Sequence, residues 1–183
     1  MKTISLEPIY VDRDDDIAII KLIDKIVEKW ESRKVVYIDM DGVLSNFSKA
    51  HSEQYCETDN PFPQSHPHFF YNLEEIEGSN HAVRELHKFY NVRIATAPSV
   101  KNPHCYTEKR QWIEKHYGDI NLQERLYIIP DKSALIGDYL IDDYDSGRGQ
   151  DKFMGELIHF GSNEYKDWNS VLDHFYFLNG GFK

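Results

Sequence analysis

Cysteines are scarce in this sequence, and long apolar runs are missing from it. Cys56 and Cys105 are the only cysteines among 183 residues, too few and too far apart for a disulfide scaffold or a thiolate zinc site. No segment approaches the roughly 20 consecutive apolar residues that a membrane span requires, and no apolar run of the signal-peptide type is present near residue 1. We therefore expect a cytoplasmic protein that has no membrane partner.

Basic residues are outnumbered by acidic ones. The chain carries 21 Lys and Arg against 31 Asp and Glu, a formal net charge of -10, which on average repels nucleic-acid backbones and anionic membranes. We therefore expect no nucleic acid polymer as a partner. A small anionic substrate is still compatible with this charge if carboxylates hold a divalent cation that provides a local positive site. The sequence leaves oligomer formation open.

The chain is long enough for one globular domain with an extension. Residues 14–32 place Ile19, Ile23, Ile26 and Trp30 at helical spacing, which predicts an amphipathic helix. Such a stripe of apolar side chains can bind a partner, but packing on a neighbouring domain is the commoner use. We expect residues 1–33 to form a helical extension packed on the core, and residues 34–183 to form the main domain.

From residue 35 onward, short apolar runs alternate with helical segments, which is the pattern of an α/β domain whose parallel sheet is flanked by helices. The predicted strands are 35–40, 92–97, 126–130, 139–142 and 157–160. The predicted helices are 81–90, 107–117 and 164–178. Residues 45–77 are rich in aromatics, prolines and histidines and do not follow this alternation. We expect them to form a small cap insertion over the sheet edge that binds the ligand.

Three of the predicted strands end in polar residues at the same edge. These are Asp39 and Asp41 at the end of the first strand, Thr96 at the end of the second, and Asp142 and Asp143 at the end of the fourth. Carboxylates gathered in a pocket repel one another unless a cation lies among them. Because oxygen ligands without Cys or His favour Mg²⁺ over zinc, the sequence predicts a magnesium site.

Two carboxylates beside Mg²⁺ can cleave a phosphate ester. Asp39 can attack phosphorus and form an aspartyl-phosphate. Asp41, two residues later, can protonate the leaving oxygen and then activate water. Alternate residues of a strand face the same side, and Gly42 allows a sharp turn directly afterwards. These residues predict a phosphatase whose substrate is a small phosphomonoester.

Four segments carry a resemblance to a known superfamily. The segment DMDGVL at residues 39–44 resembles the first motif of the haloacid dehalogenase superfamily, in which the two aspartates have these two roles. The segment IATAP at residues 94–98 resembles the second motif, and DK at 131–132 with LIDD at 140–143 resembles the third and fourth. The resemblance implies the Rossmann-like fold of that superfamily.

The resemblance also implies roles for individual residues. The Thr96 hydroxyl and a neighbouring backbone N–H, at Ala97, would hold the phosphate, and Lys132 would clamp it. The metal would be held by the Asp39 carboxylate, the main-chain carbonyl of Asp41 and one acid of the pair Asp142 and Asp143. Of that pair, we favour Asp143 for direct ligation and Asp142 for a water-mediated contact or for orienting the lysine.

Within the superfamily, the sequence resembles the 5'(3')-deoxyribonucleotidases from about residue 35 to the final helix. Residues 39–47, 69–78 and 107–118 carry this likeness. It implies hydrolysis of nucleoside monophosphates, with Phe47, Phe69 and Phe70 around the base and Lys109 on the phosphate side. Aromatic stacking can hold any base.

The sequence departs from that family around the phosphate and the sugar. Asn46 stands where an acid is usual, Ala97 where a small polar residue is usual, Val100 where a lysine is usual, and Pro130 where an arginine often precedes Asp-Lys. Two alternatives therefore remain open. One is a phosphatase of another small phosphorylated metabolite, and the other is a non-catalytic binding protein of the same fold.

Overall fold

The structure is a computed structural model that describes residues 13–58 and 61–180, and its residues group into two units, 1–33 and 34–183. In the first unit, α1 (Arg13–Glu31) is one continuous helix, as the apolar spacing predicts. Residues 1–12 of the predicted extension lie outside the described residues. The packing of α1 on the main domain stays a prediction. Within the described residues, no helix is long and apolar enough to cross a membrane.

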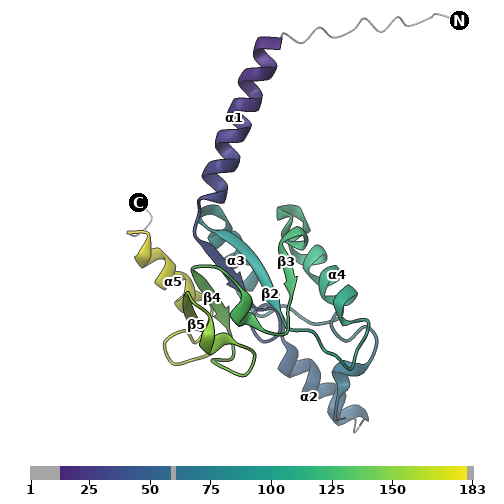
Figure 1. Cartoon of the computed structure of the whole chain (residues 1–183). Helices are drawn as coiled ribbons and strands as arrows, with labels where there is room; N and C mark the ends of the chain where they lie inside the picture. Colours follow the sequence, from purple (N-terminus) through teal and green to yellow (C-terminus); the bar gives the residue numbers. More distant parts are fainter. Residues whose placement is uncertain (1–12, 59–60, 181–183) are drawn as a thin grey trace, which may run out of the picture. The chain divides into compact units, whose positions relative to one another are not determined.

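The second unit is built on one parallel sheet in the order β3-β2-β1-β4-β5 (Figure 1). The strands are β1 (Val35–Ile38), β2 (Asn91–Thr96), β3 (Leu126–Ile128), β4 (Tyr139–Asp142) and β5 (Glu156–His159). Ile38 of β1 pairs with Ile94 of β2 and with Ile141 of β4. Because the central strands are parallel and end in step, the residues that follow β1, β2 and β4 meet at one edge.

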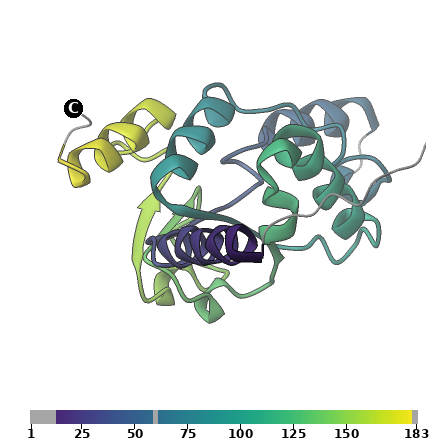
Figure 2. The same cartoon turned by 90° about the horizontal axis from the view of Figure 1, so that it is seen from above.

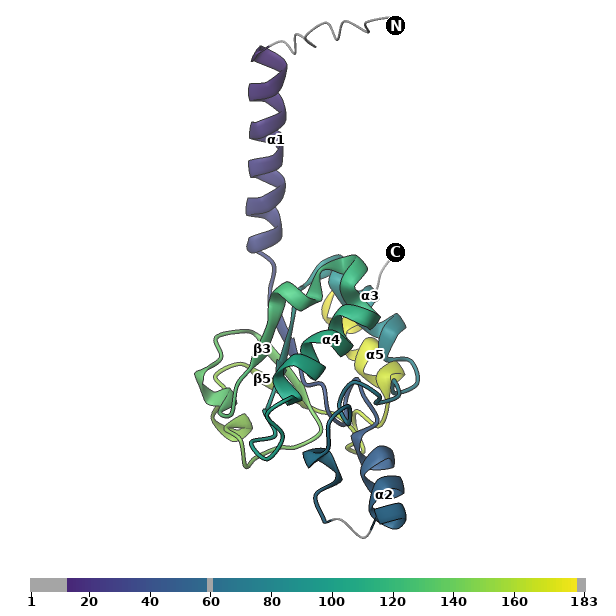
Figure 3. The same ribbon diagram turned by 90° about the vertical axis from the view of Figure 1, so that its right-hand side faces the viewer.

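Three helices cover one face of this sheet: α3 (Ser79–Phe89), α4 (Cys105–Tyr117) and α5 (Trp168–Leu178). Figure 2 shows α3 between α5 and α4, and Figure 3 shows the three on the same side of the strands. Their buried side chains, among them Leu86, Trp112 and Phe175, pack with Val36 and Ile38 of β1 in the larger core cluster. Each such side chain contributes roughly 1.5–3 kcal/mol by its burial.

Loops and short 3₁₀ helices cover the opposite face. Leu135 and Phe153 pack there on Tyr37, Ala95 and Leu140 of the strands. The adjoining 3₁₀ segments are η4 (Lys132–Ala134) and η5 (Gln150–Lys152), while η2 (Gly118–Ile120) and η3 (Leu122–Arg125) connect α4 to β3. Both faces of the strands are thus buried, which explains why the strands are nearly continuous apolar runs. The predicted α/β fold with a parallel sheet and flanking helices is confirmed.

The predicted cap region contains α2 (Phe47–Thr58), η1 (Pro63–Ser65) and a turn that leads back to the sheet domain. Two buried side chains of α4 bind this turn. Trp112 Nε1 donates to the Leu73 carbonyl at 2.8 Å, and the Glu108 carboxylate accepts from the backbone N–H groups of His68 and Phe70 at 2.7 and 3.1 Å. These bonds fix the aromatic part of the cap to the helix that follows β2.

The predicted start of the last helix, at residue 164, is wrong. The helix begins at Trp168 because Asp167 caps it: the Asp167 carboxylate accepts from the Ser170 N–H at 2.9 Å, and the Ser170 hydroxyl accepts from the Asp167 N–H at 3.1 Å. This reciprocal pair is a capping box, which ends the non-helical segment at Asp167. The apolar spacing after residue 167 is helical, as predicted.

Candidate active site

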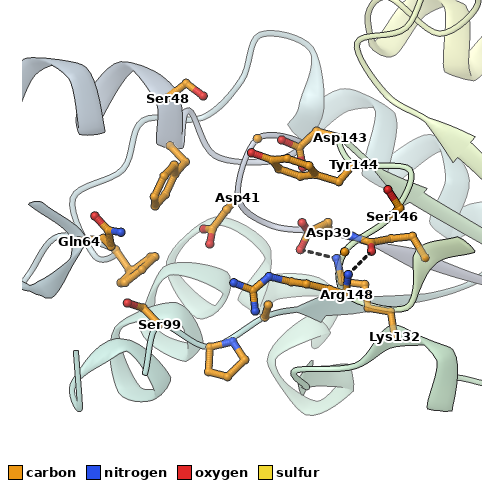
Figure 4. A pocket seen from close by; sticks show the side chains of 17 residues that line it. Asp39, Asp41, Ser48, Gln64, Ser99, Lys132, Asp143, Tyr144, Ser146 and Arg148 are labelled. Carbon is orange, nitrogen blue, oxygen red and sulfur yellow. Dashed lines mark hydrogen bonds and ion pairs between the residues drawn. The ribbon is translucent and has the colours of Figure 1, made fainter. Parts of the chain in front are cut away.

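A cavity of about 430 Å³ lies at the carboxyl edge of the sheet. Residues that follow β1, β2, β3 and β4 line it on the sheet side, and Phe47, Gln64 and Phe70 line it from the cap. Figure 4 shows Asp39, Asp41, Lys132 and Asp143 around this cavity. The carboxylates and the lysine that the sequence assigned to catalysis therefore come together in one place.

Lys132 holds two of the predicted acids. Its ammonium lies 3.1 Å from the Asp39 carboxylate and forms a short ion pair with Asp142. The Lys132 side chain is only 1% exposed. Burial lowers the pKa of Lys132, but the Asp39 and Asp142 carboxylates outweigh it and hold this pKa above its usual value. The lysine therefore stays charged and fixes the Asp39 carboxylate at the cavity wall (Figure 4).

The two acids after β4 have different surroundings. Besides Lys132, Asp142 accepts hydrogen bonds from the Tyr144 N–H at 3.0 Å and the Gln150 amide at 3.2 Å. Asp143 lines the cavity, and its buried Oδ1 has no hydrogen-bond partner among the described residues. Burial, with Asp39 and Asp142 nearby, raises the pKa of Asp143 to about 7. Both carboxylate oxygens of Asp142 thus accept from protein donors, whereas Asp143 Oδ1 has no donor among the described residues.

The same acids fit a divalent metal. One carboxylate oxygen from each of Asp39, Asp142 and Asp143 lies within 4.8 Å of the other two. All are hard oxygen donors, and the raised pKa of Asp143 indicates that its negative charge lacks compensation. A divalent cation supplies that compensation, so the donor set and the electrostatics agree.

Gly42 gives Asp143 its place. The backbone at Gly42 has a φ of +86°, a left-handed conformation that side chains disfavour, and a Cβ there would lie 2.6 Å from Cγ of Asp143. Only glycine lets the chain turn after Asp41 with Asp143 packed against the turn. The sequence predicted the turn but not this second requirement.

Asp41 is held by a buried lysine. Lys109 Nζ donates to Asp41 Oδ2 at 2.6 Å, to the Thr96 hydroxyl at 2.7 Å and to the Ala97 carbonyl at 2.7 Å. Burial raises the pKa of Asp41, and the Lys109 ammonium opposes this by lowering it. Ala97 lines the cavity, whereas Thr96 and Lys109 do not. In this structure Lys109 therefore orients Asp41 and Thr96 from behind the cavity wall.

The three predicted aromatic residues divide into two groups. Phe47 and Phe70 line the cavity, with ring centroids 6.2 Å apart and an interplanar angle of 30°. Phe69 does not line it and packs edge-on against both, at 5.3 Å from Phe47 and 5.1 Å from Phe70. Phe69 therefore supports the two rings that reach the cavity.

Several residues of the cavity wall were not predicted from the sequence. The loop after Asp143 contributes Tyr144, Ser146, Arg148 and Gln150, and further polar residues come from other loops and the start of α2: Ser48, Gln64 and Ser99. No residue spacing marks these positions. The one signal in the sequence is the pair of glycines that flank Arg148. In the structure both Gly147 and Gly149 have positive φ values, +94° and +84°.

Comparisons with known proteins identify the family of the chain. Residues 60–172 match the family described as "5' nucleotidase, deoxy (Pyrimidine), cytosolic type C protein". A putative 5'(3')-deoxyribonucleotidase of Vibrio phage KVP40 is 32% identical over 80% of this chain and 86% of that protein. The human cytosolic 5'(3')-deoxyribonucleotidase is 42% identical over 47% of this chain and 43% of that protein. The chain therefore belongs to the 5'(3')-deoxyribonucleotidase family, whose members are phosphoric monoester hydrolases.

Proposed function

We propose that this protein hydrolyses nucleoside monophosphates to nucleoside and phosphate, with Mg²⁺ as its cofactor and an aspartyl-phosphate on Asp39 as the intermediate. One observation carries the proposal: Asp39, Asp41, Lys132 and Asp143 converge on a cavity whose far side carries the Phe47 ring. The first four provide phosphoryl-transfer chemistry, and the ring provides a surface for a base. The relatives named as deoxyribonucleotidases support this substrate class.

In the first step, a carboxylate oxygen of Asp39 forms a bond to phosphorus as the bond from phosphorus to the ester oxygen breaks. Lys132 keeps the Asp39 carboxylate in place through their 3.1 Å ion pair. Burial raises the pKa of Asp41, which favours its protonated form, so Asp41 can pass a proton to the leaving nucleoside oxygen.

In the second step, Asp41 takes a proton from a water molecule, and the water oxygen bonds to phosphorus. The bond between phosphorus and the Asp39 oxygen then breaks, which releases phosphate and restores the carboxylate. Lys109 Nζ donates to Asp41 Oδ2 at 2.6 Å, and this bond would keep the carboxylate in one position for both steps. Mg²⁺, held by Asp39, Asp143 and the main-chain carbonyl of Asp41, would neutralise charge on the phosphoryl oxygens.

Phe47 and Phe70 would bind the base. Their rings lie on the cap side of the cavity, and the Glu108 carboxylate fixes the backbone of Phe70 by accepting from its N–H at 3.1 Å. Stacking on aromatic rings contributes roughly 1–3 kcal/mol per base and tolerates any base. This arrangement favours a nucleoside leaving group over a small polar one.

A panel of phosphomonoesters, assayed with and without Mg²⁺, tests the proposal. We expect the highest kcat/KM with deoxyribonucleoside or ribonucleoside monophosphates, and loss of turnover in a chelator. Asp39→Asn should abolish turnover because an amide cannot form the acyl-phosphate. Faster turnover of a phosphate ester without a base would instead identify a phosphatase of another metabolite, and no turnover across the panel would indicate a binding protein.

A further inference from the structure

Arg148 belongs to none of the motifs, yet it is one of two cationic side chains among the residues that line the cavity. The other, Lys132, is paired with Asp39 and Asp142. The Arg148 guanidinium makes no hydrogen bond or ion pair with any residue that the structure describes. It extends from the loop beside Lys132 into the cavity, toward the side where Asp41 and Ser99 lie (Figure 4). Arg148 is exposed and lines the cavity, so it presents an unpaired positive charge at the cavity wall.

The backbone of Arg148 is fixed, in contrast to its free side chain. Its N–H donates to Gln150 Oε1 at 2.8 Å, and its carbonyl accepts from the Lys132 N–H at 2.7 Å. Gln150 in turn donates to Asp142 at 3.2 Å. The base of the side chain is thus bound to the backbone of Lys132 and, through Gln150, to the acid that pairs with Lys132.

The glycines on each side of Arg148 allow its loop to pack closely against the backbone that follows Lys132. Both Gly147 and Gly149 have positive φ values, and a Cβ on Gly149 would lie 2.6 Å from the Ser133 nitrogen. Ser133 follows Lys132 directly. At Gly149 the loop therefore approaches the backbone beside Lys132 more closely than any residue with a side chain would allow. A loop packed in this way places an arginine side chain at a defined point, whereas a loose surface loop does not.

The charges around the cavity indicate what Arg148 binds. Three carboxylates line the cavity, those of Asp39, Asp41 and Asp143, and they repel an anionic substrate. A divalent cation held by these acids would offset part of that charge, and Lys132 is already engaged by two acids. A guanidinium has two parallel N–H donors that match two oxygens of a phosphoryl group, and it remains charged at every physiological pH.

We propose that Arg148 is a substrate-binding residue that holds the phosphoryl group of the nucleoside monophosphate in the cavity. This inference rests on the proposed function, since it assigns a further contact for the same substrate. Arg148 takes no part in bond making, so its loss should weaken phosphate binding and raise KM more than it lowers kcat.

Titration of inorganic phosphate into the full chain in the presence of Mg²⁺, followed by calorimetry, tests the inference without requiring turnover. We expect Arg148→Gln to weaken phosphate binding roughly ten-fold, the loss of one charge-assisted hydrogen-bonded contact. Arg148→Lys should retain part of the affinity because the charge remains. Arg110→Gln is the matched control: Arg110 is exposed on α4, pairs with Glu114 and does not line the cavity, so phosphate binding should stay unchanged.

Titration of a phosphate-free nucleoside, thymidine, separates the phosphate from the base. Arg148→Gln should leave thymidine binding unchanged. Equal phosphate affinity in the wild type and in Arg148→Gln overturns the inference, as does a variant that loses thymidine binding and keeps phosphate binding. A wild type that binds phosphate but hydrolyses no monophosphate refutes the proposed function alone, and a wild type that binds no phosphate refutes both.

Discussion

Lys132 has a structural role that can be measured apart from catalysis. Replacing the lysine with methionine leaves the charge of Asp142 buried and unpaired, because Asp142 is fully buried and loses the one cationic partner it has among the described residues. Breaking a buried ion pair from one side costs about 3–5 kcal/mol. We therefore expect Lys132→Met to lower the free energy of unfolding by about that amount in the metal-free protein.

Removing the unpaired charge of Asp142 should restore part of the lost free energy of unfolding. In the double variant Lys132→Met/Asp142→Asn, the neutral amide can still accept from the Tyr144 N–H and from Gln150, as the Asp142 carboxylate does at 3.0 and 3.2 Å. The double variant should therefore be more stable than the sum of the two single changes predicts, by roughly 1–3 kcal/mol. It should remain inactive, because Asp39 has lost the ammonium that holds it.

Urea denaturation at pH 7 in a chelator, followed by tryptophan fluorescence, measures these free energies, since Trp112 and Trp168 are buried. Lys49→Met is the matched control. Lys49 pairs with Glu74 at 2.7 Å, but both side chains are exposed, at 45% and 68%. The urea midpoint of this control should hardly change. Additive effects of Lys132→Met and Asp142→Asn would refute the reasoning that the two charges stabilise each other.

Three further predictions concern the metal and the cap. In the metal-free protein, burial raises the pKa of Asp143 from 3.8 to about 7, so its contribution to stability is fully present below about pH 3.8 and is lost as the pH rises to about 7. Mg²⁺ should therefore raise the melting temperature more at pH 8 than at pH 5.5, where protons compete for Asp143; an equal shift at both values would contradict this. Gly42→Ala should abolish that Mg²⁺-induced rise in melting temperature, because the added Cβ would collide with Asp143. It should also lower the free energy of unfolding by about 1–2 kcal/mol, because alanine disfavours the left-handed backbone at this position. An unchanged rise in melting temperature with Mg²⁺ would contradict this prediction. Phe47→Ala should raise KM roughly ten-fold for nucleoside monophosphates and leave ribose 5-phosphate unaffected, with exposed Phe177→Ala as the control in the same kinetic assay.

The strands and the sheet edge that carries the candidate site could be predicted from the sequence because two physical patterns coincide there. Strands buried on both faces are apolar runs, and polar residues at their ends, such as Thr96 at the end of β2 and Asp39 directly after β1, stand out against those runs. Parallel strands then bring these residues to one edge whatever the details of the loops. The limits of β4 are those predicted, and those of the other strands differ by at most two residues, which leaves the positions of the acids unaffected.

The cap and the remaining cavity wall could not be predicted in this way. Helix α2 has few apolar residues, chiefly Phe47, Ala50 and Tyr55, so its sequence lacks a helical period. Contacts with distant residues determine the rest of the site. Gln150 is placed by its bond to Asp142, and Phe70 by its bond to Glu108, and local sequence encodes neither pairing.

The most direct test of the central claim is to identify the phosphorylated residue during turnover. Quenching the reaction with acid, reducing the acyl-phosphate with borohydride and sequencing the peptides by mass spectrometry converts a phosphorylated aspartate to homoserine. We predict homoserine at position 39 in the wild type with Mg²⁺ and a nucleoside monophosphate, and none in Asp39→Asn, which should also be inactive. Turnover without any modification at Asp39, or full activity of Asp39→Asn, would contradict the account.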